Sequence, residues 1–422
     1  MANSEHLALI EQGVEVWNSW YKEHKRIIPD LSQANLSQLN LNGINLKKAI
    51  LIQANFSNTD LSNAQLNNAN LSKANLLGAN LNNSSFKGAN LDFAILFKAI
   101  MNRQTIISDK YRQVHQIVNR QSENKDFTGI DLSNSNLFRA DLSNAELSHA
   151  KLTNANLNSA KLNSAYLYKA DLTNANLQNA DLRNAYFSQA NLTSAYLGGA
   201  LCCGAYFKDA ELKFANLKAA KLSHKTMIDL KWYSVWEIVN RGAAKKNLSG
   251  ADLSNANLQG VDFEEANLTN AKLSNAILRR SNLTNANLTN TDLVGANVCG
   301  VDLDRANLKG AKLKAVISDR HTQLSAVANT KTNLVVKERP PIESAKVPES
   351  PTQIQRDVSS QAETLENNQQ KRGKNWLGLF FLGAIATSLG LTYVFWTQNP
   401  DYPWSAKLET WKGHLEQFMP QK

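Results

Sequence analysis

A five-residue period runs through most of this 422-residue chain and limits what it can fold into. An apolar residue, nearly always Leu, returns at every fifth position, with Ala usually two places earlier and Asn or Asp one place earlier. The first run extends from Leu31 to Met101 over 15 positions, the second from Phe127 to Leu222 over 20, and the third from Leu248 to Leu313 over 14. A period of five fits neither the 3.6-residue helix nor the two-residue strand. The pattern therefore predicts a solenoid built from repeats.

The residue types within each unit explain how such a solenoid would hold together. If the Leu and the Ala both point inward, one unit cannot bury its own Leu, so stacked coils must share a core. The small Ala suits a narrow interior that a larger side chain would overpack. Asn, Asp, Ser, Thr and Gly fill the other positions and supply turns and local side-chain hydrogen bonds. Proline is absent from residues 30–339, as expected if most backbone donors bond between coils.

Units such as residues 54–58 (Ala-Asn-Phe-Ser-Asn), 69–73 (Ala-Asn-Leu-Ser-Lys) and 155–159 (Ala-Asn-Leu-Asn-Ser) resemble the A-(D/N)-L-x-x unit of the pentapeptide repeat family. The resemblance covers 49 units, about two thirds of the chain. It implies an all-β repeat fold, a right-handed quadrilateral β-helix with four units to a coil. At a strand spacing of ~4.8 Å, the units would form about 12 coils with a total length of roughly 60 Å. We call residues 31–101 segment 1, residues 127–222 segment 2 and residues 248–316 segment 3.

Two interruptions separate the segments and are copies of one module, residues 102–126 and 223–247. Lys110-Tyr111 matches Lys231-Trp232, and residues 114–120 match residues 235–241, at a constant offset of 121. In the second copy Trp232, Val235, Trp236 and Val239 recur at helical spacing, which predicts a short amphipathic helix. We expect each insert to cover a segment or pack on its side. A binding role is the alternative, although aromatic stripes at helical spacing are more often packing surfaces.

The N-terminal residues 1–30 carry a helical pattern. Apolar residues recur three or four places apart, at Leu7, Ile10, Val14, Trp17 and Tyr21. This spacing predicts one helix over residues 4–25 that caps the first coil, since an uncapped coil would expose unpaired edge groups and the core. The stretch does not resemble a secretory signal, because it contains acidic residues and lacks a continuous apolar run.

The composition changes after Ile317. Residues 317–375 are polar, contain four prolines and lack periodicity, which predicts a disordered linker. Residues 376–396 hold 15 apolar or aromatic residues and no charge, which predicts a transmembrane helix with a length of ~31 Å. Residues 397–422 form a short amphipathic tail that could lie on the opposite membrane surface. A buried helix of a soluble domain is the alternative for residues 376–396.

The residues flanking the apolar run predict its orientation. Trp376 and Trp396 mark its two ends, and Lys371, Arg372 and Lys374 lie just before it. Because positive charge resists translocation, we expect the solenoid in the cytoplasm and the C-terminus across a thylakoid or plasma membrane. Within the run, Ala386 and Gly390 form a small-xxx-small pair, which leaves a homo-oligomer open.

Charge and composition narrow the classes of function. Some pentapeptide repeat proteins are thought to mimic DNA and inhibit gyrase, which needs an acidic surface, but this chain has a net charge of +10. Its basic residues are dispersed among acidic ones, which argues against a nucleic-acid binder. The seven His and three Cys lack metal-site spacing, and no phosphate loop or nucleophile elbow is present. We therefore predict no enzyme, no cofactor and no metal.

One outward-facing feature does not follow from the repeat. Tyr166, Tyr186 and Tyr206 each lie one place before an apolar position and are 20 residues apart, with Phe187 and Phe207 next to the last two. Four units per coil would stack the tyrosines into an exposed ladder and the phenylalanines into a core ladder. The tyrosines could dock a protein partner, or they could simply stabilise the stack.

Together these features predict a non-enzymatic, membrane-tethered β-solenoid that serves as an interaction scaffold for an unknown protein partner. A regulator of a membrane transport or photosynthetic assembly is the alternative, with a gyrase-type inhibitor behind it. The layout of three segments with helical inserts is similar to cyanobacterial members of the family.

Overall fold

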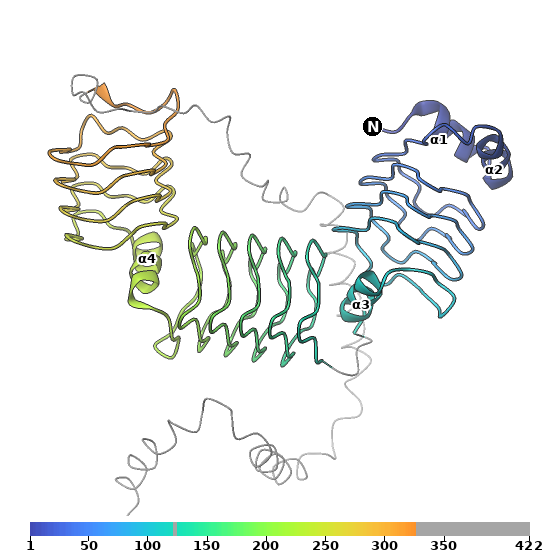
Figure 1. Ribbon diagram of the computed structural model, residues 1–422, viewed down its shortest axis with the longest axis horizontal. Coiled ribbons are helices and arrows are strands. Elements are labelled where there is room, and N and C mark those ends of the chain that lie inside the picture. Colours follow the sequence, from blue (N-terminus) through green and yellow to red (C-terminus); the bar gives the residue numbers. More distant parts are fainter. Residues whose placement is uncertain (121–124, 326–422) are drawn as a thin grey trace, which may run out of the picture. The chain divides into compact units, whose positions relative to one another are not determined.

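The computed structural model describes residues 1–120 and 125–325. In all three segments the backbone pairs in parallel with itself at an offset of 20 residues, as Asn35 does with Asn55 and Asn55 with Asn75. Four five-residue units therefore complete one coil, and Figure 1 shows the coils stacked within each segment. The predicted β-helical repeat is confirmed.

The expectation of an all-β fold needs one correction. Within the described residues each side of a coil contributes one isolated bridge, and no strand of several residues forms. The reason is that a unit has only five residues and must also turn a corner. In the unit around Leu51, the Leu51 N–H donates to the next coil at Asn70 O, and Ala54 N–H already turns back to Leu51 O at 3.1 Å.

The inward residues form a continuous apolar stack in each segment. In segment 2, Leu172 and Ala170 are fully buried, and the same holds for their counterparts Leu152 and Ala150 one coil earlier. Where Thr59, Ser281 or Thr291 replaces the Ala, its hydroxyl donates to a carbonyl of the preceding coil; Thr59 Oγ1 bonds Leu36 O at 2.6 Å. The Ser84 hydroxyl donates to Leu81 O of its own coil at 2.6 Å. The buried polar group is thus paired, and the core stays closed.

The outward Asn positions are explained by two local requirements. Asn55 Oδ1 accepts a hydrogen bond from the N–H of Ser57 at 3.1 Å, which fixes the corner, and its Nδ2 donates to Asn35 Oδ1 at 3.0 Å one coil away. The residue two places after the Leu has a positive φ, as at Asn63 (57°) and Asn174 (57°). Asn tolerates this left-handed conformation better than most residues, so it recurs there.

The N-terminal cap consists of two helices where the spacing predicted one. α1 spans Ser4–Glu11 and α2 spans Val14–Glu23. Gly13 has a φ of 109° and ends the first helix, because such a backbone cannot continue a right-handed helix. Both helices pair with the first coil: Asp30 N–H donates to His6 Nδ1 at 3.1 Å and Asn45 N–H to Asn18 Oδ1 at 2.8 Å.

Each insert contains one helix that covers the last coil of the preceding segment (Figure 1). α3 spans Asp109–Val118 and α4 spans Leu230–Arg241. The buried ring of His115 bonds Ala99 O at 2.7 Å, and Trp236 Nε1 donates to the corresponding Ala220 O at 2.8 Å. The two inserts thus carry different rings at the same position of the helix, and each ring bonds the corresponding backbone carbonyl of the coil that it covers.

Segment 3 continues beyond its predicted end. Ile317 pairs with Asn297 and Gln323 pairs with Asp302, so the predicted linker does not begin at residue 317. The extension repeats a turn that closes segments 1 and 2, in which a Thr hydroxyl donates to a carbonyl of the coil before it: Thr105 to Leu81 O, Thr226 to Cys202 O and Thr322 to Val298 O. The sequence N/S/D-x-x-T carries this turn in all three copies.

The predicted transmembrane helix, most of the linker and the C-terminal tail lie outside the described residues. Among the helices that the structure describes, none is long and apolar enough to cross a membrane.

A polar substitution at an inward position should unfold the coil around it. Leu172→Asp removes ~1.5 to 3 kcal/mol of apolar burial and places a charge in a closed core, so we expect the free energy of unfolding to fall by several kcal/mol. Leu201→Asp is the matched control, because Leu201 faces outward in line with Asp181 and Lys221. Urea unfolding of the full chain measures both. Equal effects at the two positions would contradict the inward and outward assignment.

Candidate functional site

The tyrosine ladder (Tyr166, Tyr186 and Tyr206) lies on one outward side of segment 2. Its members bridge one another in sequence. The Tyr166 and Tyr186 rings stack with centroids 4.7 Å apart and 4° between planes, and Tyr186 stacks on Tyr206 at 4.7 Å and 18°. All three side chains remain partly exposed. The rings cover each other's faces, so their edges and hydroxyls are what a partner would meet.

The surroundings of the ladder extend its aromatic surface. Tyr168 lies beside Tyr166 at 6.4 Å between ring centroids and also meets His149 edge to face at 5.8 Å. Lys169 places its ammonium 5.1 Å from the Tyr168 ring centroid. At the other end Met227 bridges Tyr206 and is 49% exposed. Aromatic and methionine side chains thus share one surface, and both are enriched in protein interfaces.

A second stack of aromatic rings lies in the core, at the positions next to Tyr186 and Tyr206. Phe187 and Phe207 are buried and lie parallel at 4.8 Å between centroids. The backbone pairing between coils sets the spacing of both the inner and the outer rings. Burial raises the pKa of Tyr206, and the neighbouring Tyr186 adds to the rise. The Tyr206 hydroxyl is therefore neutral and can donate a hydrogen bond.

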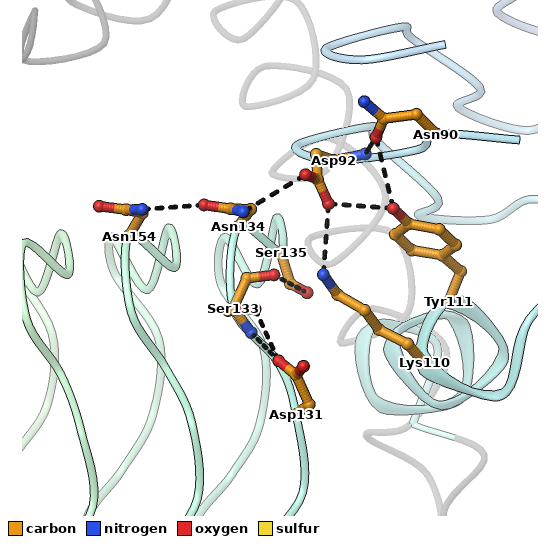
Figure 2. A network of polar contacts seen from close by, with 9 residues as sticks. All are labelled: Asn90, Asp92, Lys110, Tyr111, Asp131, Ser133, Asn134, Ser135 and Asn154. Carbon is orange, nitrogen blue, oxygen red and sulfur yellow. Dashed lines mark hydrogen bonds and ion pairs between the residues drawn. The ribbon is translucent and has the colours of Figure 1, made fainter. Parts of the chain in front are cut away.

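A second cluster, which we call the polar junction, joins segments 1 and 2 (Figure 2). The Asp92 carboxylate accepts hydrogen bonds from Lys110 Nζ at 3.2 Å, from the Tyr111 hydroxyl at 2.9 Å and from Asn134 Nδ2 at 3.3 Å. The Phe93 N–H donates to Asn134 O at 2.7 Å. Burial raises the pKa of Tyr111 to about 12; a hydrogen bond from the Leu91 N–H opposes the rise and the Asp92 carboxylate adds to it.

Segments 2 and 3 are joined by a backbone hydrogen bond like that between Phe93 and Asn134, but no carboxylate stands at the position of Asp92. Phe214 N–H donates to Asn255 O at 2.8 Å. Lys213 stands where segment 1 has Asp92, and Trp232 replaces the tyrosine. Lys231 bonds Ser254 Oγ at 2.9 Å and lies 3.4 Å from Asp252. The backbone link is therefore common to both contacts, and the polar junction is particular to the first.

The structure brings the three predicted tyrosines together, whereas the predicted membrane-flanking residues Lys371, Arg372, Lys374, Trp376 and Trp396 lie outside the described residues. Sequence reasoning missed Asp92. The signal for it was an acidic residue at a place in the unit where Ser and Thr are the most frequent residues. Across residues 1–120 and 125–325 no group of His, Cys, Asp and Glu could hold a metal ion. Burial raises the pKa of the Cys202 thiol to about 12, so it remains protonated.

The raised pKa of Tyr111 predicts a loss of stability at alkaline pH. A free tyrosine titrates at 10.0 and Tyr111 at about 12. Between these values the unfolded chain releases the proton first, so the free energy of unfolding falls as pH rises. Tyr111→Phe should reduce this fall by on the order of 1 kcal/mol. Urea unfolding across this pH range measures it, and parallel curves for the two proteins would count against the buried hydroxyl.

Comparisons with known proteins follow the repeat. The family model described as pentapeptide repeats matches residues 30–103, 126–223 and 247–317. Among curated proteins no relative matches the sequence. Among solved structures, HetL from Nostoc sp. strain PCC 7120, a pentapeptide repeat protein involved in regulating heterocyst differentiation, is 25% identical. The match covers 72% of this chain and 97% of HetL, with a TM-score of 0.20.

Two shorter matches have higher identity. A second Nostoc pentapeptide repeat protein is 36% identical over 18% of this chain and 73% of its own, with a TM-score of 0.14. A pentapeptide repeat protein of the Arabidopsis thaliana thylakoid lumen is 33% identical over 26% of this chain and 74% of its own, with a TM-score of 0.16. The family model covers more than half of the chain. This chain belongs to the pentapeptide repeat family.

Proposed function

We propose that the chain is a non-enzymatic scaffold, tethered to a membrane, that binds a protein partner through the tyrosine ladder. The observation that carries the proposal is the stack of three partly exposed tyrosines at 4.7 Å, continued by Tyr168 and by Met227. Rigid aromatic side chains lose little conformational entropy on binding and are enriched at binding hot spots.

The ladder favours binding over a purely structural role because the fold does not require it. On the opposite side of segment 2 the same place in the unit holds Asn136, Asn156 and Asn176, and the backbone bridges form there equally. The core beneath the tyrosines is complete without them, since the Phe187 and Phe207 rings fill it. A stack of aromatic rings that the repeat could replace with Asn is best explained by an external contact.

The charge distribution supports a protein partner over DNA or gyrase. A DNA mimic needs an acidic surface, and the chain carries 46 basic and 36 acidic residues. Several cations are paired, as in Lys208 with Asp229 and Lys213 with Glu211. Paired charges cannot replace the counterions of a phosphate backbone, so they contribute little to nucleic-acid binding.

The membrane part of the proposal rests on the sequence. Residues 376–396 are long and apolar enough to span a bilayer, and Lys371, Arg372 and Lys374 precede them. A linker of nearly 60 residues would let the solenoid reach roughly 40 Å from the bilayer. This arrangement would suit a regulator of a membrane transport or photosynthetic assembly in a cyanobacterial thylakoid or plasma membrane.

Removing the tyrosine ladder should abolish partner binding and leave the fold intact. Tyr166→Asn, Tyr186→Asn and Tyr206→Asn combined introduce the residue most common at this place in the unit. Tyr196→Asn is the matched control, because Tyr196 occupies the same place on another side, paired with Asn176 and Asn216. Crosslinking and pull-down from native membranes compares the two variants with wild type. A partner set that survives the triple change and matches the control would make the ladder structural.

The membrane tether can be tested by deletion and by topology. Deleting residues 376–396 should move the protein from the membrane to the soluble fraction with its β-rich circular dichroism retained. In sealed vesicles of known orientation, protease should digest the solenoid only where the cytoplasmic face is accessible. Digestion from the other face would reverse the proposed orientation, and an intact chain that fractionates as soluble would refute the tether.

A further inference from the structure

The last coils of segments 1 and 2 show how this chain covers the open end of a solenoid. Several backbone N–H groups at each end have no following coil to bond, and two of them show how they are covered. At the end of segment 1, Phe93 N–H donates to the backbone of segment 2 at 2.7 Å, and Lys98 N–H donates to Asn119 Oδ1 just after α3 at 2.7 Å. At the end of segment 2 the same roles fall to Phe214 N–H and to Ala219 N–H, which bonds Asn240 Oδ1 at 2.6 Å.

The end of segment 3 has the same two positions without the covering groups. Gly310 corresponds to the two phenylalanines, and Ala315 corresponds to Lys98 and Ala219. Neither N–H has a hydrogen-bond partner within residues 1–120 and 125–325. Both residues are exposed. At the place of Asn119 and Asn240 the sequence has Val336, which lacks a side-chain oxygen to accept these bonds.

The same edge carries unbalanced positive charge. Lys309, Lys312 and Lys314 lie on the last coil and are exposed, and in the part of the chain that the structure describes none of them forms an ion pair. Three carboxylates near this edge have partners of their own, and a fourth, Asp292, which bridges Lys312 one coil away, accepts from the Val294 N–H. Asp302 pairs with Arg305 at 3.6 Å, Asp304 accepts from Ser325, and Asp319 accepts from Thr322 and Gly300. Among residues 125–325, N–H donors without a partner and lysines without an ion pair thus coincide at this edge.

The positive charge of this edge and the covering of the first coil by α1 and α2 exclude a second copy of the chain as the molecule that binds here. Two such edges facing each other would bring six lysines together, and like charges repel. The first coil of segment 1 is not available either, because α1 and α2 already cover it through Asp30 N–H and Asn45 N–H. The occupant must supply carbonyl oxygens in an extended backbone and negative side chains.

We propose that this edge of segment 3 docks an extended, acidic peptide segment of a protein partner, which adds to the solenoid as a further rung. Its carbonyls accept from Gly310 and Ala315, as the backbone and the Asn side chains do at the other two ends. Its carboxylates lie against Lys309, Lys312 and Lys314. This is strand addition at an unprotected edge, in which the backbone gives affinity and the side chains give specificity.

The test uses the full chain in a non-ionic detergent and a fluorescein-labelled hexapeptide of alternating glutamate and valine, followed by fluorescence anisotropy. Wild type should bind this probe. Lys309→Gln with Lys314→Gln should weaken binding about tenfold. The matched control is Lys213→Gln with Lys218→Gln, which occupies the same two positions on the covered end of segment 2 and should leave affinity within about twofold of wild type. Circular dichroism verifies that both variants fold.

Three further arms separate the proposal from its rivals. The same peptide N-methylated at every valine keeps its charge and its carbonyls, but its methyl groups hold the backbone away from the edge and remove the N–H donors of a paired rung, so it should bind more weakly; equal binding would overturn the added rung. A six-residue oligodeoxythymidylate should bind more weakly, and tighter binding would assign the edge to nucleic acid. Glu338→Gln, Glu343→Gln and Glu349→Gln combined should leave affinity unchanged. Tighter binding by that variant would mean that the chain's own acidic residues fill the edge. Absence of probe binding by wild type, or equal loss in the control, would reject the site.

Discussion

The hydrogen-bond exchange between consecutive coils is the interaction on which the rest of this structure depends. In each unit the N–H of the inward Leu donates to a carbonyl 19 residues later, as Leu172 does to Asn191 O at 2.7 Å. The bridge residue returns a bond to the coil before it, as Asn191 N–H does to Ala170 O at 2.9 Å. Because each coil supplies hydrogen-bond partners to its neighbours, the backbone groups inside a segment are paired. Backbone groups without a following or preceding coil occur at the two ends of the segment.

The four described helices supply hydrogen-bond partners to the backbone groups at the ends of the segments. α1 and α2 supply acceptors to the first coil, and α3 and α4 cover the last coils of segments 1 and 2. Asn119 and Asn240 each make two of these contacts with a single side chain. Each side chain accepts from an N–H that has no following coil to bond and donates to a backbone carbonyl of the last coil, Leu96 O or Leu217 O. Interrupting the repeat therefore costs little stability, provided that the interruption brings its own hydrogen-bonding groups.

Much of the fold could be read from the sequence because the repeat imposes one environment on many residues. The five-residue period identified the inward Leu and Ala, and the 20-residue spacing of the tyrosines predicted their stacking, which the ring distances show. What could not be read lay where the period ends. Gly13 divides the N-terminal helix through its backbone conformation, which apolar spacing does not report. The turn at Asp319–Thr322 was hidden because no apolar residue marks it.

The polar junction was missed for a different reason. Its members come from three places in the sequence, Asp92 in the last coil of segment 1, Lys110 and Tyr111 in the insert, and Asn134 in the first coil of segment 2. A repeat pattern predicts what lies one coil away, at 20 residues, and says nothing of contacts 18 or 42 residues apart. Such contacts depend on how the insert folds back, which only the structure shows.

The outward positions of the repeat, unlike the inward ones, can change without disturbing the fold. This bears on how the family could acquire binding surfaces. The backbone bonds and the two inward side chains hold the fold together. The bridge position therefore tolerates Lys151, Asn156, Lys161 and Tyr166 in the four consecutive units of one coil of segment 2 without altering the pairing. Substitutions there change what the surface presents and leave the core untouched. Three tyrosines in register at 4.7 Å thus form a surface whose spacing is set by the coil and whose chemistry is set by single residues. A partner that reads this spacing would recognise the stack as a unit, because each ring is held in place by the next.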